Sequence, residues 1–179
     1  AAEAELAAIG AALQARWAQL APGQPLNWVF QQRGEAQRSA GRADTHVMAG
    51  RVPDPHVVTE AGARYRVHVL RGQNHGLFLD TAQCRRWVAQ HVQHLATSSP
   101  SGPRVLNLFA YTCAFSVVAL HAGAAQVVNV DMARGPLAVG QRNHQLNGLR
   151  SGAVFWAHDL FTSWGKVGRN GPYDLVIAD

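Results

Sequence analysis

Three short apolar segments, each carrying an acid or amide toward its carboxyl end, constrain the fold of this 179-residue chain most strongly. They are RVLNLF (104–109), QVVNVD (126–131) and YDLVIAD (173–179). Continuous apolar runs are typical of parallel strands that helices bury on both faces. The intervening sequence predicts a strand at 152–157 and helices at 115–123, 133–147 and about 160–168. This alternation predicts an α/β fold, a Rossmann-like, doubly wound parallel sheet with right-handed crossovers.

Polar side chains gather where these strands end. In doubly wound sheets, ligands bind beyond the carboxyl ends of the strands. Four residues lie at or just beyond such ends: Asn107, Asp131, Asp159 and Asp179. Their shared position predicts a ligand site at this edge of the sheet.

Two of these acids have alternative roles. The Asp131 carboxylate can accept both ribose hydroxyls of an adenosine, or it can cap the helix that follows Ala133. Asp159 can accept the exocyclic amine of adenine, with Leu160 or Phe161 covering the ring, or it can cap the next helix. The pattern favours ligand binding for Asp131 and leaves both roles open for Asp159.

The loop after the first strand, NLFAYTC (107–113), contains no glycine. A dinucleotide needs G-x-G-x-x-G here, because its pyrophosphate approaches the backbone closely. S-adenosylmethionine carries a sulfonium and an amino-acid tail instead of pyrophosphate, and Thr112 offers it a hydroxyl. Cys113 is interpreted as a small loop residue rather than a nucleophile, since no neighbouring base or charge would lower its pKa.

The first hundred residues have a different pattern. Residues 3–21 predict an amphipathic helix that APGQP ends, and 26–70 predict short antiparallel strands separated by Gly and Pro. A further helix follows Asp80, which is placed to cap it. We therefore divide the chain into a helix and β-rich region (1–72), a lid segment with a helix and linker (73–103), and the Rossmann-like part (104–179).

Charge and cysteine content narrow the function classes. The formal net charge is +5, and nine arginines fall between Arg33 and Arg86 against five acids. This balance fits either a face that meets phosphates or solvated surface charge. Two cysteines without a pairing framework favour a reducing, cytoplasmic setting. We expect no metal site, with His91 and His94 as exposed helical side chains, and no membrane span, for which ~20 apolar residues are needed.

Five segments between Gln73 and Asp179 form a specific series: GLFLDTAQCRRW, VLNLFAYTCAFSVVA, VVNVDMARGPLAVGQRNHQLNGL, HDLF and YDLVIAD. Together they resemble the class I S-adenosylmethionine-dependent methyltransferases, in the subgroup of large-subunit rRNA methyltransferases of the I and K types. In that family the first loop is typically N-x-F-[SA]-Y-T-G, so a glycine-poor loop is usual here. This chain departs from the family pattern at Ala82, where Arg is frequent, and at Cys113, where Gly is preferred.

The resemblance implies S-adenosylmethionine as the cofactor, with the methionine part on the 107–113 loop, the ribose on Asp131, the adenine on Asp159 and the GLFLD segment as a lid. The cofactor-binding residues assigned on this basis are Phe78, Asp80, Arg85, Asn107, Phe109, Ala110, Tyr111, Thr112, Cys113, Asp131, Met132, Asp159 and Leu160. Asp179 is assigned as catalytic. In the family the fourth strand leads to Asp-Pro-Pro and three more strands, so we expect an incomplete methyltransferase domain.

The expected function is methyl transfer from S-adenosylmethionine to a base of 23S rRNA, with region 1–72 holding the RNA backbone. Three alternatives stay open: an NAD-dependent dehydrogenase on a similar sheet, a non-catalytic RNA-binding module, and a methyltransferase for small molecules or proteins. The missing glycine fingerprint argues against the first, and the basic balance leans against the third. The nucleotide, the methylated atom and the oligomeric state are left undetermined by the sequence.

Overall fold

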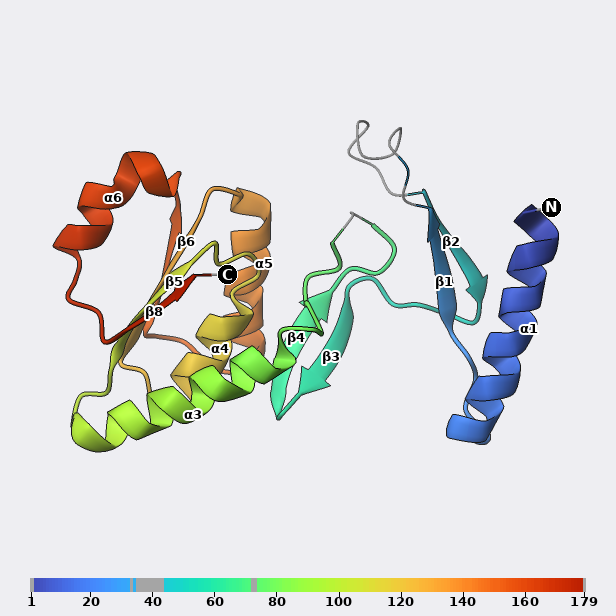
Figure 1. The fold of residues 1–179 in the computed structure, drawn as a ribbon, viewed down its shortest axis with the longest axis horizontal. Helices are drawn as coiled ribbons and strands as arrows, with labels where there is room; N and C mark the ends of the chain where they lie inside the picture. The colour runs from blue at the N-terminus through green and yellow to red at the C-terminus, as the bar shows by residue number, and fades with distance from the viewer. Residues whose placement is uncertain (1, 33, 35–43, 72–73, 179) are drawn as a thin grey trace. The chain divides into compact units, whose positions relative to one another are not determined.

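A computed structural model describes residues 2–32, 34, 44–71 and 74–178 of the chain. The chain forms two compact units, whose helices and strands are labelled in Figure 1. Unit 1 comprises Ala1–His56 and His68–His75, and unit 2 comprises Val57–Val67 and Gly76–Asp179. Within the described ranges, no helix has both the length and the apolar character that crossing a membrane requires.

Unit 1 contains a helix and an antiparallel strand pair. Its elements are α1 (Ala2–Leu20), β1 (Trp28–Gln32) and β2 (Asp44–Ala49). The helix approaches β1 at Gly10, where an added Cβ would lie 3.2 Å from Cζ2 of Trp28. The turn after β2 requires glycine, because Gly50 has a φ of +71° and an added Cβ would lie 1.9 Å from Oδ1 of Asn27.

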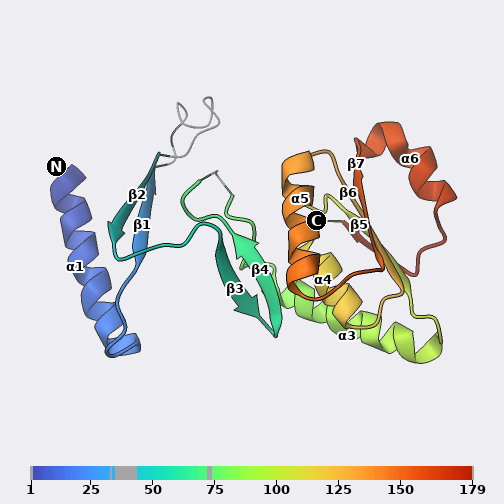
Figure 2. The ribbon, with the colours of Figure 1, turned by 180° about the vertical axis from the view of Figure 1, so that it is seen from behind.

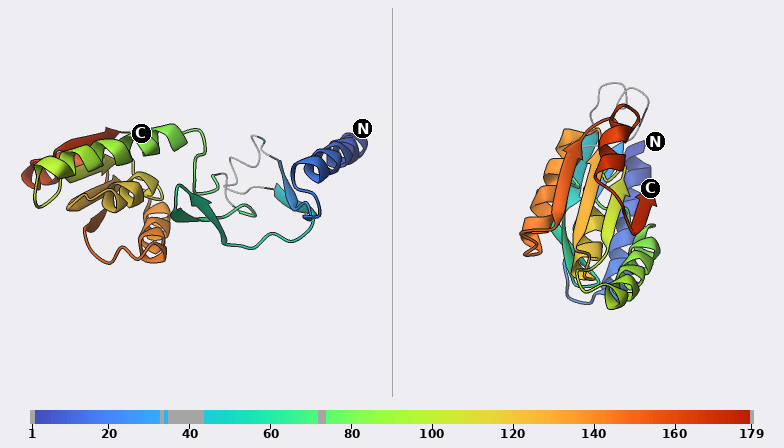
Figure 3. Two further views of the ribbon diagram at one scale, coloured as in Figure 1. Left: turned by 90° about the horizontal axis from the view of Figure 1, so that it is seen from below. Right: turned by 90° about the vertical axis from the view of Figure 1, so that its left-hand side faces the viewer.

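Unit 2 is built on a parallel sheet. Its elements, from the boundary onward, are β3 (His56–Glu60), β4 (Ala63–Val67), α3 (Ala82–Ser98), β5 (Arg104–Leu108), α4 (Ala114–His121), β6 (Gln126–Asp131), α5 (Arg134–Leu146), β7 (Ala153–Ala157), α6 (Leu160–Arg169) and β8 (Leu175–Ala178). Four strands pair in parallel in the order β7-β6-β5-β8, and Figure 3 gives further views of them. The doubly wound fold is therefore confirmed, and its elements end within two residues of the predicted positions.

Alternating side chains of the strands face two different layers of helices. Val105 of β5 and Val127 of β6 are fully buried against α3 and α4. Leu106 and Val128, one position further along, face the opposite side and pack with Val167 of α6. Figure 2 shows α4 and α5 on one side of the sheet and α6 on the other. Burial on both faces explains why these strands read as continuous apolar runs.

The β3–β4 hairpin belongs to the sheet unit, although the sequence analysis grouped it with region 1–72. Side-chain amides from α5 and from the residue that follows it complete the outer hydrogen bonds of β4. Oδ1 of Asn143 accepts from the Arg66 N–H at 2.9 Å, and Oδ1 of Asn147 accepts from the Arg64 N–H at 2.8 Å. Nδ2 of Asn147 also donates to the Arg64 carbonyl at 2.6 Å. These contacts join residues about 80 positions apart, which local pattern does not reveal.

A chain of buried polar side chains links β5 to α5. Asn107 donates from Nδ2 to Oδ1 of Asn129 at 2.9 Å, and Asn129 donates to Oγ of Ser116 at 3.1 Å. Ser116 lies 2.9 Å from Nε2 of His144, whose Nδ1 lies 2.7 Å from the Gly140 carbonyl. Because that carbonyl can only accept, Nδ1 carries the proton, and in the neutral imidazole Nε2 accepts from Ser116. Burial disfavours the charged imidazole and so lowers the pKa of His144.

We expect this histidine to make the protein less stable in mild acid. In the unfolded chain the imidazole takes up a proton near its ordinary pKa of 6.5, whereas the folded state binds it only at lower pH. The free energy of unfolding should therefore fall as pH drops below about 6.5, between the unfolded and the lowered folded pKa. Urea denaturation from pH 7.5 to 5 measures this slope. His144→Gln should flatten it, while His94→Gln, on the exposed side of α3, should leave it unchanged; equal slopes in all three proteins would contradict the prediction.

Candidate functional site

A cavity of about 190 Å³ opens at the carboxyl edge of the sheet. It is lined by Phe109, Val130, Asp131, Met132, His158, Asp159, Leu160 and Phe161. The chain winds from β5 outward to β7 and then returns to β8 on the other side of β5, so the strand order reverses beside β5. Loops diverge at such a reversal and leave a crevice where ligands bind. The two acids predicted to meet at this edge, Asp131 and Asp159, line the same cavity.

The loop beside the cavity holds three non-glycine residues in the left-handed backbone region. The φ angles are +53° at Phe109, +45° at Tyr111 and +60° at Cys113. Each such residue costs roughly 1–2 kcal/mol relative to a right-handed conformation. Backbone strain of this kind clusters at functional sites, where the surrounding structure maintains it. It also explains why glycine suits position 113, although this chain has cysteine there.

Asp131 connects this loop to the end of β6. Its Oδ2 accepts from the Tyr111 N–H at 2.8 Å, and its Oδ1 accepts from the Ala133 N–H at 2.8 Å. Asp131 does not cap α5 itself, since the N-cap residue is Ala133 and no side chain accepts a cap hydrogen bond there; it holds the turn that leads into the helix. Each carboxylate oxygen has a second acceptor position. Asp131 can therefore hold the loop and still accept hydrogen bonds from a ligand in the cavity.

Asp159 caps α6. Its Oδ1 accepts from the Phe161 N–H at 2.9 Å, while Oδ2 accepts no hydrogen bond from the residues that the structure describes. Phe161 is 84% exposed and Met132 is 75% exposed, so both present apolar surface at the cavity rather than in the core. Leu160 lines the cavity and packs on the α6 side of the sheet. Asp159 therefore caps α6 through Oδ1 and keeps Oδ2 available as an acceptor for a ligand.

The residues predicted as a lid lie outside the cavity lining. The Phe78 ring lies 5.4 Å from the Tyr111 ring, centroid to centroid, beside the loop. Asp80 is exposed, and the residue that precedes α3 as its cap is Thr81 rather than Asp80. The helix begins one residue later than Asp80 would require. Phe78 alone of the three lid candidates contacts a ring of the loop within the described residues.

Arg85 is a buried anchor. It is 2% exposed, and its Nε and Nη2 donate to the two carboxylate oxygens of Glu60 at 2.7 and 2.8 Å. It also donates to Oγ1 of Thr81 at 2.6 Å and to the Phe78 carbonyl at 2.9 Å. These contacts fasten the segment before α3 to the hairpin. The hydrogen bond from Arg85 holds the pKa of Glu60 below its usual value.

Three further candidates lie beneath the loop. The Thr112 hydroxyl donates to the Gly76 carbonyl, and Asn107 begins the buried polar chain. The Cys113 thiol is fully buried, and that burial raises its pKa, which opposes nucleophilic chemistry. Ala110 is also buried. The predicted catalytic residue, Asp179, lies outside the described residues.

Some residues at the cavity, among them Val130 and His158, were missed by the sequence analysis. His158 lines it, and its Nε2 lies 2.9 Å from Nζ of Lys166. That ammonium also lies 4.4 Å from the centroid of the Trp156 ring, within range of a cation–π contact. The available signal was the position of His158 directly before Asp159, at the end of a strand.

Close packing beneath the loop predicts a strong effect of one added methyl group. An added Cβ at Gly140 of α5 would lie 2.5 Å from Sγ and 3.0 Å from Cβ of Cys113. We expect Gly140→Ala to lower the free energy of unfolding by about 1–3 kcal/mol, because a filled core does not accept the extra volume. Cys113→Gly should recover part of that loss when both changes are combined. A double-mutant cycle by urea denaturation measures the coupling, and strictly additive effects would disprove the contact.

Comparisons with known proteins identify the family of this chain. A family model described as S-adenosylmethionine-dependent methyltransferase matches residues 11–179. Ribosomal RNA large subunit methyltransferase I of Aeromonas salmonicida is 34% identical over 138 residues, which cover 75% of this chain and 33% of that protein. Ribosomal RNA large subunit methyltransferase K/L of a Psychrobacter strain is 35% identical over 148 residues, covering 81% and 17%.

Solved structures share the same fold. A methyltransferase crystallised with SAH is 31% identical, has a TM-score of 0.64, and is matched over 75% of this chain and 34% of its own. The structure of aTrm5 in complex with tRNALeu, at 17% identity and a TM-score of 0.60, shares the fold over 91% of this chain and 43% of its own. This chain spans a third or less of the length of these two curated relatives.

Proposed function

Because this chain belongs to the S-adenosylmethionine-dependent methyltransferase family, we propose that it binds S-adenosylmethionine in the cavity beside Asp131 and serves in methyl transfer to an RNA base. One observation carries the proposal. Asp131 and Asp159, which belong to different strand–helix connections, line a single cavity next to a strained loop.

The residues present fit an adenosine. Asp131 offers acceptor positions to two neighbouring hydroxyls, as a ribose requires. The second oxygen of Asp159 can accept the exocyclic amine of adenine. Val130, Leu160 and Phe161 supply apolar surface for a flat ring. A cavity of about 190 Å³ suits this part of the cofactor, with the remainder extending along the 109–113 loop.

The chain's own contribution is positioning and charge. When bound, S-adenosylmethionine supplies a methyl group on a positively charged sulfonium. Asp131 holds the strained loop against β6, and the Phe78 ring lies against the Tyr111 ring of that loop. Asp179 directly follows the last described strand and is proposed to face the acceptor base. Alignment of the acceptor atom within ~3–3.5 Å of the methyl carbon is the main requirement of such a transfer.

We infer that the acceptor is a base of large-subunit ribosomal RNA, specifically 23S rRNA. Relatives about 34% identical are named ribosomal RNA large subunit methyltransferase I, which supports the large-subunit RNA as substrate. The net charge of +5 and the arginines of region 1–72 support contact with phosphates. A base within a duplex would have to be unpaired or flipped to be reached. A cytoplasmic location follows from this substrate.

Cofactor binding tests the proposal directly. We expect the full chain to retain tritiated S-adenosylmethionine in equilibrium dialysis and to show no saturable retention of labelled NAD, because the loop lacks the glycines that a pyrophosphate needs. Incubation with deproteinised rRNA and methyl-labelled cofactor should then place label in large-subunit RNA. Retention of NAD alone would overturn the proposal in favour of a dehydrogenase. Cofactor binding with label in protein or small molecules, and none in RNA, would overturn the substrate.

A further inference from the structure

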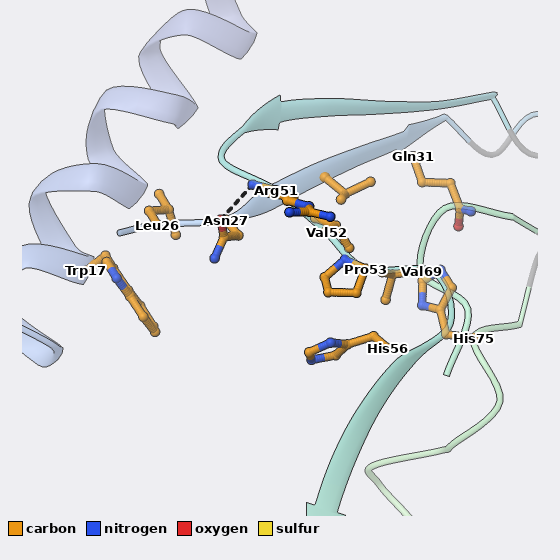
Figure 4. A pocket seen from close by; sticks show the side chains of 11 residues that line it. Trp17, Leu26, Asn27, Gln31, Arg51, Val52, Pro53, His56, Val69 and His75 are labelled. Carbon is orange, nitrogen blue, oxygen red and sulfur yellow. Dashed lines mark hydrogen bonds between the residues drawn. The ribbon is translucent and has the colours of Figure 1, made fainter. Parts of the chain in front are cut away.

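A second and larger cavity, of about 460 Å³, lies entirely within unit 1. Its volume is within the range of small-molecule sites. Four segments of the chain line it (Figure 4): Trp17, Leu26, Asn27, Val29, Gln31, Arg51, Val52, Pro53, His56, Val69 and His75. None of the residues assigned to the cofactor belongs to this set.

The walls of the cavity carry flat ring surfaces. Figure 4 shows the indole of Trp17 on one side of the space and the rings of Pro53 and His56 on the other. Nε1 of Trp17 donates to the Gln24 carbonyl at 3.0 Å, which fixes the indole and leaves its faces for stacking. Aliphatic side chains, among them Leu26 and Val52, also line the cavity. Such walls suit a planar heterocycle.

One polar group in the cavity is held in a fixed orientation. Oδ1 of Asn27 accepts from the Arg51 N–H at 2.8 Å, so the amide nitrogen points toward the open space, as Figure 4 shows. The absence of a side chain at Gly50 makes this orientation possible, since a Cβ would lie 1.9 Å from that oxygen. The Asn27 amide therefore presents two N–H donors to a ligand. Ring nitrogens and carbonyl oxygens of a nucleobase are suitable acceptors.

The charge at the rim is positive. Arg51 is exposed, and none of the described residues that line the cavity is acidic. The neighbouring acid, Asp54, is already paired: Oδ1 lies 2.6 Å from Nδ1 of His68, and Oδ2 lies 2.8 Å from Nε of Arg71. The Arg51 guanidinium is thus placed for an anionic ligand group rather than for an internal partner within the described chain.

We propose that this cavity binds one unpaired nucleotide of an RNA strand, and the inference rests on the proposed RNA substrate. The base stacks between Trp17 and the rings of Pro53 and His56, and the Asn27 amide donates to its edge. Arg51 binds the adjoining phosphate. Stacking on aromatic side chains beside a basic group is the usual way in which proteins hold single-stranded RNA. The site holds a nucleotide away from the reacting base and so positions the strand.

Two variants and a matched control test the site. Affinity of the full chain for a short, unstructured, fluorescein-labelled oligoribonucleotide is measured by anisotropy. We expect Trp17→Leu, which keeps apolar volume but removes the stacking ring, to weaken binding by about 5- to 100-fold. Arg51→Gln should lower the slope of log affinity against log salt by about 0.7, the value for one phosphate contact on a single strand. Arg16→Gln, an equal charge change on exposed α1 outside the cavity, should alter neither quantity.

Two further measurements separate the alternatives. Binding of S-adenosylmethionine should be unchanged in every variant, because none of the changes lies in the cavity beside Asp131. If the unaltered chain itself does not bind S-adenosylmethionine, that result counts against the proposed function and not against this site. Ribonucleoside monophosphates should compete only weakly with the oligonucleotide. Displacement of the oligonucleotide by micromolar monophosphate would overturn the strand assignment in favour of a free-nucleotide site. Unchanged RNA affinity in Trp17→Leu together with an unchanged salt slope in Arg51→Gln would overturn the site itself.

Discussion

Replacement of Arg85 by methionine is expected to lower the free energy of unfolding by about 3–5 kcal/mol, the range for breaking a buried ion pair on one side. Arg85 is 2% exposed and makes four hydrogen bonds to Glu60, Thr81 and Phe78. Methionine fills similar volume but leaves the Glu60 carboxylate and the Phe78 carbonyl without this donor. Because the Glu60 side chain is 19% exposed, water can partly replace the arginine, which favours the lower end of the range.

Urea denaturation of the full chain measures this loss, and two further variants interpret it. Arg86→Met changes the neighbouring exposed arginine and should shift stability by less than about 0.5 kcal/mol. Glu60→Gln, combined with Arg85→Met, should recover part of the loss because no unpaired carboxylate remains. A loss below 1 kcal/mol for Arg85→Met would show that the pair does not hold the segment before α3.

The Arg85–Glu60 pair also predicts how the free energy of unfolding changes in acid. Arg85 lowers the pKa of Glu60, so the stabilisation is complete above the ordinary carboxyl pKa of 4.5 and is lost as pH falls through the lowered folded value. The stability difference between the unaltered chain and Arg85→Met should therefore shrink in acid. A difference that grows as pH falls would contradict this assignment.

Replacement of Asp131 by alanine is expected to weaken the binding of S-adenosylmethionine by about 10- to 100-fold, since a hydrogen bond to a charged group contributes about 1.5–3 kcal/mol. The change removes the ribose acceptor and also the two hydrogen bonds that fix the loop, to Tyr111 and Ala133. Asp131→Asn keeps one acceptor oxygen, but its amide nitrogen cannot accept from the backbone. It should therefore fall between alanine and the unaltered chain.

Equilibrium dialysis with labelled cofactor measures these affinities. Glu5→Gln, on exposed α1 in the other unit, is a control for the loss of one negative charge. Asp159→Asn should have a smaller effect than Asp131→Ala, because the asparagine oxygen can still cap α6. Hydrogen exchange at the Tyr111 amide separates a disordered loop from a lost ligand contact. Retention of cofactor affinity within twofold in Asp131→Ala would place the ribose elsewhere.

The sequence was sufficient for the sheet and for the edge at which the candidate cavity opens. The apolar runs at β5 and β6 are local signals, and the parallel order makes their carboxyl ends neighbours. Asp131 and Asp159 follow directly from that reasoning. The capping role considered for Asp159 is also found in the structure, because a cap depends on the next few residues only.

Other residues assigned to the cofactor do not line the cavity, because their side chains hydrogen-bond to groups that are distant in the chain. Arg85 lies in the same segment as Phe78, yet it bonds to Glu60, 25 positions earlier. The Thr112 hydroxyl is taken by Gly76, 36 positions earlier. Nothing in the local sequence of either residue identifies that partner.

The amino-acid sequence by itself determined where helices and strands form, which strands are buried on both faces, and which sheet edge gathers acids, because periodicity and capping act over a few neighbouring residues. Only the tertiary structure decided which polar side chains remain available to a ligand. A donor N–H or O–H, or one acceptor position of an oxygen, is occupied by whichever partner lies within about 3 Å of it, and folding brings that partner from any part of the chain. The cavity in unit 1 is assembled from four segments, so it too is a feature that only the tertiary structure decided.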